Sequence, residues 1–189
     1  MRLFVAIALP EDVKESIRLM IEGLRGQGRT IRWIPPGNVH LTLKFLGEVA
    51  PQIVERVESI LQDVVHPHPS FELTVRGSGV FPSPRQPRIV WLGLGTHPVL
   101  EEIQRELEEG LGPLGFEPED REFRPHLTIG RIKSGRRLGA GERDSLMNNL
   151  RSLDYGSRSF RVTSIDLMES ILKPTGAEYR VRASYPLKG

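Results

Sequence analysis

The chain has 189 residues, of which 38% are apolar and 26% charged, and its formal net charge is +2 at pH 7. It contains no cysteine, which excludes disulfides, thiolate nucleophiles and thiolate metal sites. No apolar run approaches the roughly 18 to 20 residues that span a bilayer, and the stretch at 3–9 is too short for a signal peptide. The composition predicts a cytoplasmic globular protein with no membrane partner.

The hydrophobic pattern predicts short strands that alternate with amphipathic helices. Strands are expected near residues 3–8, 31–34, 39–46, 71–75, 89–94, 125–132, 159–162, 165–170 and 178–185. Helices are expected from Pro10 to the glycines at 26 and 28, from Pro51 to about 65, near 97–111 and near 142–150. Gly77-Ser78-Gly79 is interpreted as a turn, and His66 and His68, each next to a proline, as exposed loop residues.

One four-residue pattern occurs twice, as His40-Leu41-Thr42-Leu43 and as His126-Leu127-Thr128-Ile129. In an extended strand, alternate side chains share a face, so each copy presents its histidine and threonine on one side. The flanking elements also recur in the same order. We therefore expect residues 1–189 to form a single bilobal α+β domain with an internal duplication. Its two pseudo-symmetric lobes of antiparallel sheet would carry helices on their outer faces, and the motif strands would face a cleft between the lobes.

Two histidines on opposite sides of a phosphodiester suit in-line hydrolysis, which needs a base at the entering oxygen and an acid at the leaving oxygen. Imidazole, with an unperturbed pKa near 6.5, can be neutral in one copy and charged in the other at neutral pH. The hydroxyls of Thr42 and Thr128 could donate to the non-bridging oxygens, where charge develops. This chemistry requires neither a metal nor a cofactor. Symmetry alone does not assign the acid and the base.

Other interpretations of these residues have less support. A single histidine on a strand is most often structural, but two in a repeated frame argue against that role. A zinc site would lack thiolate ligands and a His-Glu-x-x-His helix, and no Gly-x-Ser-x-Gly elbow marks a serine hydrolase. Lys133-Ser134 lacks the glycine pattern of a nucleotide triphosphate loop.

Residues 73–100 and 123–141 contain arginine or lysine but no acidic residue, which favours a phosphate-binding surface over a merely solvated basic face. The substrate-binding candidates are Arg131, Arg124 and Lys44. Arg131 could hold an anion at the end of its strand, and Lys44 shares the face of Thr42 in a regular strand, which places Phe45 in the core. Candidates to stack on a base, although core positions are commoner for such residues, are Trp33, Phe81 and Tyr155.

Residues 32–47 (RWIPPGNVHLTLKFLG) and 123–131 (FRPHLTIGR) closely resemble the two signatures of the RNA 2′,3′-cyclic phosphodiesterases, also called 2′-5′ RNA ligases, of the 2H phosphoesterase superfamily. Residues 81–84 (FPSP), 87–93 (PRIVWLG) and 167–170 (LMES) are also similar to that family, and the resemblance covers nearly the whole chain. Gly130 stands where the family commonly has alanine. The resemblance implies that His40 is the general acid and His126 the general base.

The implied reaction is that of an RNA 2′,3′-cyclic 3′-phosphodiesterase, which opens a terminal cyclic phosphate to a 2′-phosphate without a cofactor. With a 5′-hydroxyl RNA end in place of water, the same site would form a 2′-5′ linkage. The expected partner is RNA with a cyclic phosphate end, for which tRNA fragments are one candidate source, and the protein is expected to be a monomer. Alternatives are the same chemistry on small cyclic nucleotides or 2′-5′ oligonucleotides, and a non-catalytic module that binds RNA ends.

Overall fold

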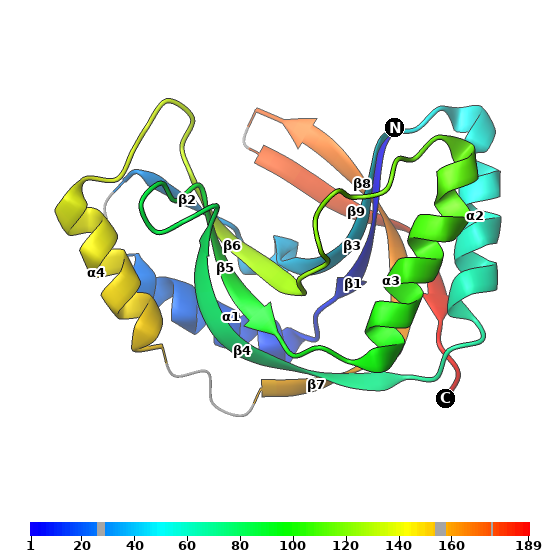
Figure 1. Ribbon diagram of the computed structural model, residues 1–189, viewed down its shortest axis with the longest axis horizontal. Helices are drawn as coiled ribbons and strands as arrows, with labels where there is room; N and C mark the ends of the chain where they lie inside the picture. Colours follow the sequence, from blue (N-terminus) through cyan, green and yellow to red (C-terminus); the bar gives the residue numbers. More distant parts are fainter. Residues whose placement is uncertain (26–28, 154–157, 175) are drawn as a thin grey trace.

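The computed structural model describes residues 1–25, 29–153, 158–174 and 176–189 and consists of one strongly curled sheet with helices outside it (Figure 1). The strand order is β7-β4-β5-β6-β3-β1-β8-β9, and β2 pairs with β6 beside this path. The strands are β1 Arg2–Ala8, β2 Ile31–Trp33, β3 His40–Glu48, β4 Phe71–Phe81, β5 Ile89–Leu94, β6 His126–Ile132, β7 Arg158–Val162, β8 Ser164–Lys173 and β9 Gly176–Pro186. The helices are α1 Glu11–Leu24, α2 Pro51–Val65, α3 Pro98–Leu111 and α4 Ala140–Arg151, with short 3-10 turns at Pro36–Asn38 and Gly112–Leu114.

The sheet divides into two lobes at the junction of β3 and β6. From this junction one lobe runs outward through β1, β8 and β9, and the other through β5, β4 and β7. Helices α2 and α3 pack on the first lobe, and α1 and α4 lie beside the second (Figure 1). The pairings between these strands are antiparallel. The expected α+β architecture, an antiparallel sheet with helices on its outer faces, is confirmed.

Helix α3 illustrates why the predicted helices form where they do. Its apolar residues recur every three or four positions and are fully buried against the sheet: Leu100, Ile103, Leu107 and Leu111. Burying one such side chain contributes about 1.5 to 3 kcal/mol. His97 caps the helix, because its Nδ1 accepts a hydrogen bond from the Val99 N–H, and Pro98 occupies the first turn, where no N–H is needed.

Two local expectations are wrong. Gly77-Ser78-Gly79 is not a turn: β4 runs unbroken through it with a β-bulge between Val75 and Ser78, where Gly77 has a φ of +74°, a conformation that suits glycine. His68 is not an exposed loop residue. Its side chain is 10% exposed, and its Nε2 lies 2.8 Å from Oε2 of Glu106 on α3. Gly26, Gly28 and Tyr155 lie outside the described residues. Among the residues described, no helix has both the length and the apolar character to cross a membrane.

Candidate active site

The two motif strands meet at a single pair of residues. Leu41 of β3 is the register partner of Leu127 of β6, and both leucines are completely buried on the helix side of the sheet. One residue further on either side, an antiparallel register places His40 opposite Thr128, and likewise Thr42 opposite His126. These four side chains therefore share the other surface of the sheet. In a regular pair, the diagonal positions that the two histidines occupy are about 7 to 8 Å apart.

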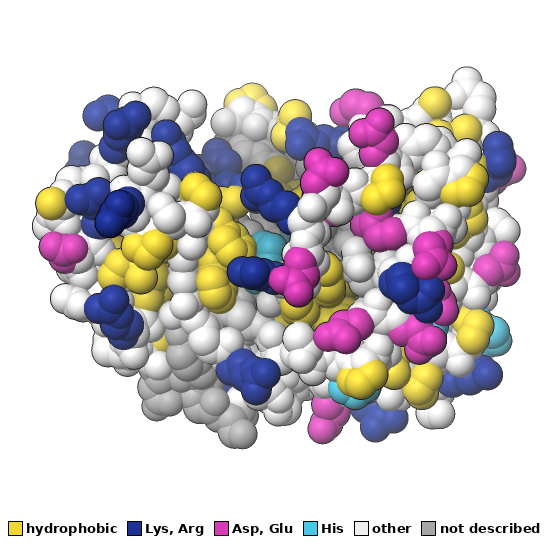
Figure 2. All heavy atoms as spheres, in the orientation of Figure 1, with side chains coloured by type: hydrophobic (Ala, Val, Ile, Leu, Met, Phe, Trp, Pro, Cys, Tyr) yellow, Lys and Arg dark blue, Asp and Glu magenta, His cyan; other side chains and the backbone are white. Residues whose placement is uncertain are grey.

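That surface lies in a hollow between the two lobes. Figure 2 shows the hollow near the centre of the molecule, with a histidine side chain at its floor and lysine or arginine side chains on its rim. Each lobe thus contributes one histidine and one threonine to a shared concave surface.

Both histidine rings are held in the same way. Nδ1 of His40 lies 2.8 Å from the carbonyl oxygen of Asn38, and Nδ1 of His126 lies 2.7 Å from the carbonyl oxygen of Arg124. A carbonyl can only accept, so each Nδ1 carries the hydrogen and donates it. In the neutral ring, Nε2 then holds the lone pair and is free to take a proton. The backbone two residues upstream therefore orients each imidazole for proton transfer through Nε2.

The surroundings of the two rings differ. The His40 ring lies 4.8 Å from that of Phe4 and 5.1 Å from that of Tyr179, whereas the His126 ring has one aromatic neighbour among the described residues, the nearly perpendicular ring of Phe81 at 5.2 Å. Burial lowers the pKa of His40 below its ordinary value, the hydrogen bond to Asn38 opposes this, and the positive charge of Arg131 lowers the pKa further. Arg131 belongs to the other lobe. Its effect on the pKa of His40 therefore means that its guanidinium lies within electrostatic reach across the hollow.

Each motif strand contains a β-bulge at the fourth motif residue. Strand β1 pairs Ala6 with Thr42 and Val5 with Lys44, which leaves Leu43 as the extra residue. In the same way, β5 pairs Trp91 with Thr128 and Val90 with Gly130, which leaves Ile129 extra. A bulge shifts the alternation by one residue, so side chains beyond it change face.

The bulge at Leu43 explains why the expectation for Lys44 is wrong. Lys44 does not share the face of Thr42: its side chain is 1% exposed, and its Nζ lies 2.5 Å from Oε2 of Glu108 on α3. It also donates to the carbonyl oxygen of Glu117, at 3.0 Å. The same shift turns Phe45 out of the core, where we expected it, and leaves it 59% exposed. Lys44 is therefore a structural residue on the helix side.

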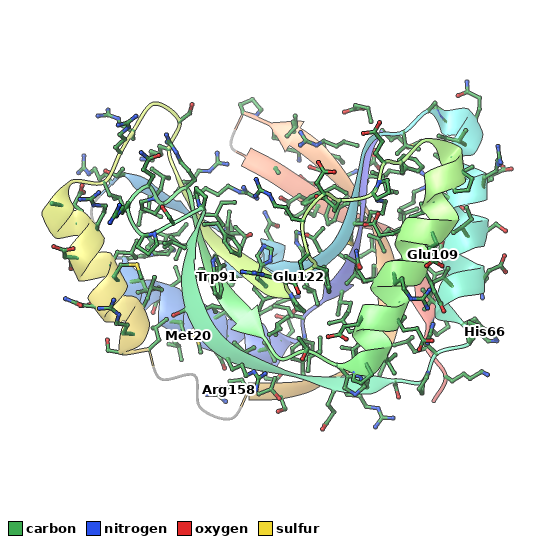
Figure 3. All side chains as sticks on the ribbon, in the orientation of Figure 1. Met20, His66, Trp91, Glu109, Glu122 and Arg158 are labelled. Carbon is green, nitrogen blue, oxygen red and sulfur yellow. The ribbon has the colours of Figure 1, made fainter. Side chains whose placement is uncertain are left out.

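The other two basic candidates, Arg131 and Arg124, differ in their surroundings. The bulge at Ile129 places Arg131 on the side of the hollow, opposite Arg32 of β2. Arg124 instead donates to Glu122, with Nη2 3.3 Å from Oε2. Figure 3 labels Glu122 on the segment that leads into β6. The carbonyl of Arg124 orients His126, and its exposed side chain stays a candidate for binding substrate. The structure thus brings Arg131, but not the Lys44 side chain, to the side of the motif residues.

Aromatic residues surround the motif, and sequence reasoning found only some of them. Phe81 stacks on Trp91, at 5.0 Å, and meets His126. Trp33 packs against the backbone of Gly130, where an added Cβ would lie 3.0 Å from its ring. Phe4 and Tyr179, which contact His40, were missed, because no local pattern marks a strand residue that reaches the motif only through pairing of distant strands.

Comparison with known proteins places this site in a family. The sequence profile of the LigT-like phosphoesterases matches residues 7–91 and 95–179. The chain belongs to this family. It is 35% identical over 181 residues to the RNA 2′,3′-cyclic phosphodiesterase of Methanothermobacter thermautotrophicus, with 94% of each chain covered.

Solved structures give the same result for this LigT-like phosphoesterase. It resembles TT0787 of Thermus thermophilus with a TM-score of 0.83 and 26% identity, over 100% of this chain and 99% of that one. It resembles E. coli LigT complexed with 3′-AMP with a TM-score of 0.76 and 26% identity, over 100% and 98% of the chains. Within the described ranges, no three metal-binding side chains are grouped closely enough to hold an ion. The site of this phosphoesterase offers two oriented imidazoles and two hydroxyls on one surface.

Proposed function

We propose that this LigT-like phosphoesterase hydrolyses terminal RNA 2′,3′-cyclic phosphates to 2′-phosphates by metal-independent catalysis with His40 and His126. The observation that carries the proposal is the matched anchoring of the two rings, each of which directs Nε2 away from a backbone carbonyl. The name of the M. thermautotrophicus relative and the 3′-AMP bound to E. coli LigT support a substrate with a ribonucleotide phosphate.

In the proposed reaction, Nε2 of His126 takes a proton from water as the water oxygen attacks phosphorus. The bond from phosphorus to the 3′ oxygen breaks, and Nε2 of protonated His40 gives its proton to that oxygen. Thr42 and Thr128 donate hydrogen bonds to the non-bridging oxygens, which gain charge in the transition state. One proton enters at His126 and one leaves from His40, so exchange with solvent restores the starting state.

The role of His40 as the acid requires it to be protonated when the substrate is bound. Burial and the charge of Arg131 oppose this in the free protein, since both lower the pKa of His40. A phosphodiester anion bound beside both residues would offset the charge of Arg131 and favour the imidazolium. Arg131 then acts as a substrate-binding residue, and substrate binding is coupled to proton uptake by His40.

We also propose that residues 1–189 form one bilobal domain with an internal duplication. Leu43 and Ile129, the bulged residues, occupy corresponding motif positions, and each motif strand is followed outward by the first strand of its own half of the chain. This repeated arrangement supports an active site shared between two related halves, with neither half complete alone.

The decisive experiment incubates the purified protein, in the presence of EDTA, with an RNA that ends in a 2′,3′-cyclic phosphate, and identifies the product isomer by chromatography. We expect a 2′-phosphate. His40→Ala and His126→Ala should each lower kcat/KM by about 10² to 10⁴, while the exposed His66→Ala serves as the matched control. Circular dichroism verifies that each variant folds.

Two results would contradict the proposal: full activity in both motif variants, or activity abolished by EDTA. A non-catalytic module that binds RNA ends would give no product at any protein concentration. Small cyclic nucleotides and 2′-5′ oligonucleotides, tested alongside, identify the preferred substrate. Addition of an RNA with a 5′-hydroxyl end tests for 2′-5′ ligation, which uses the same groups with the hydroxyl in place of water.

A further inference from the structure

Many basic residues of the second lobe have no acidic partner among the described residues. On the first lobe several basic residues form ion pairs, for example Arg105 with Glu109 and Arg182 with Glu58. In the described part of the chain, no ion pair within 4.0 Å involves Arg32, Arg85, Arg88, Arg131, Lys133, Arg136, Arg137, Arg143 or Arg151. Figure 2 shows basic side chains gathered on the left lobe and acidic ones mostly on the right.

The two acid-free stretches of the sequence meet on this lobe. Nη1 of Arg88 donates to the carbonyl oxygen of Arg136 at 3.2 Å, and Nη1 of Arg143 donates to the carbonyl oxygen of Arg85 at 2.8 Å. These bonds join the segment between β4 and β5 to the segment that follows β6 and to α4. The basic residues thus form one continuous surface although they are far apart in the sequence.

A cavity of about 470 Å³ lies at the α4 end of this surface and is lined by Pro84, Arg85, Arg143, Asp144, Met147, Asn148 and Arg151. Three guanidinium groups face one carboxylate there, so the lining is positively charged. Arginine matches phosphate oxygens with two parallel hydrogen bonds, and its planar group also stacks on bases. The cavity therefore has the chemistry to hold a nucleotide unit.

The opposite end of the surface reaches the motif hollow. Arg131 and Arg32 are directly opposed across the β2–β6 pair, an arrangement that is unfavourable for like charges unless an anion lies between them. The positive charge of Arg131 also lowers the pKa of His40. We call the surface that runs from Arg32 and Arg131 to the cavity of Arg85, Arg143 and Arg151 the basic track.

We infer that the basic track binds the sugar-phosphate backbone of the nucleotides that precede the reactive end of an RNA chain. The inference rests on the proposed function, which places the reactive end in the motif hollow. Single-stranded RNA fits better than an acidic protein, because its regularly spaced phosphates match the forked guanidinium groups and the track continues from the site proposed for a phosphodiester. The protein should then prefer oligonucleotides to mononucleotides, whatever their sequence.

The test compares a 2′,3′-cyclic mononucleotide with an RNA of about 12 nucleotides that has the same cyclic end. The triple variant R85Q/R143Q/R151Q should raise KM for the RNA by roughly tenfold or more and leave kcat/KM for the mononucleotide unchanged. The slope of log KM against log salt for the RNA should fall by about 0.7 for each phosphate that the variant no longer binds. The matched control R56Q/R105Q/R182Q removes the same charge from the other lobe and should retain the wild-type preference.

A triple variant that folds and retains the wild-type KM for the RNA overturns the inference, even if turnover itself is confirmed. If the triple variant is unstable, R85E replaces it, since the Arg85 side chain makes no hydrogen bond with the described residues; an unchanged KM in R85E counts equally against the track. If the protein turns over neither substrate, the proposed function fails, and fluorescence anisotropy of the labelled RNA tests the track directly. Equal affinity in wild type and R85E, or tighter binding of a glutamate peptide than of RNA, then overturns it.

Discussion

Replacing Lys44 with methionine distinguishes a structural lysine from one that contacts substrate. The ammonium lies between the Glu108 carboxylate and the Glu117 carbonyl, and the side chain is 1% exposed. Removing one partner of a buried ion pair costs about 3 to 5 kcal/mol. Glu108 retains a hydrogen bond from Gln104, at 3.1 Å, and is 15% exposed, so the lower end applies. About 3 kcal/mol should lower Tm by roughly 6 to 12 °C in a domain of this size.

Urea unfolding and thermal circular dichroism measure the loss of stability in Lys44→Met. The kcat/KM of the variant is determined at a temperature well below its Tm. The control Lys14→Met removes an ion pair whose glutamate is 87% exposed and should cost less than about 1 kcal/mol. Lys44→Met combined with Glu108→Leu removes both buried charges and should recover much of the stability. Wild-type Tm in Lys44→Met together with a kcat/KM about 100-fold lower would refute the structural role and restore the contact with substrate that the strand pattern predicts.

Three further predictions concern the pKa of His40, the packing at Gly130 and the burial of Asp166. NMR titration should give His40 a pKa below the ordinary 6.5, and Arg131→Gln should raise it; no change would show that Arg131 lies out of reach. Because the folded state disfavours the imidazolium, His40 should reduce the free energy of unfolding as pH falls below about 6.5. Gly130→Ala should cost about 1 to 3 kcal/mol through overpacking against Trp33, and a cost that stays the same in a Trp33→Leu background would contradict that contact. Burial raises the pKa of Asp166, so Asp166→Asn should be as stable as wild type or more stable at pH 7, with the gain shrinking toward pH 4; urea unfolding at both pH values checks this, and a larger gain at pH 4 would contradict it.

Local sequence accounts for the positions of the helices and for the two histidine motifs. The apolar residues of α3 recur at helical spacing, and His97 and Pro98 mark its start, so its limits could be predicted without tertiary information. The repeated His-Leu-Thr pattern likewise fixes which side chains share a face within each strand, because alternation is a property of the extended backbone. Up to the third residue of each motif, every side chain lies on the face that strand alternation predicts.

Beyond that residue, the outcome depends on pairing between segments that are distant in the chain. The bulges at Leu43 and Ile129 arise from the register with β1 and β5, and no alternating pattern reveals an extra residue. The bulge at Leu43 turns Lys44 to the helix side, where Glu108 on α3, 64 positions later, pairs with its charge. The sequence by itself determined the two histidine motifs and the helices. Tertiary structure alone decided which basic residues face the hollow, since a one-residue change of register moves a side chain to the opposite surface of a sheet.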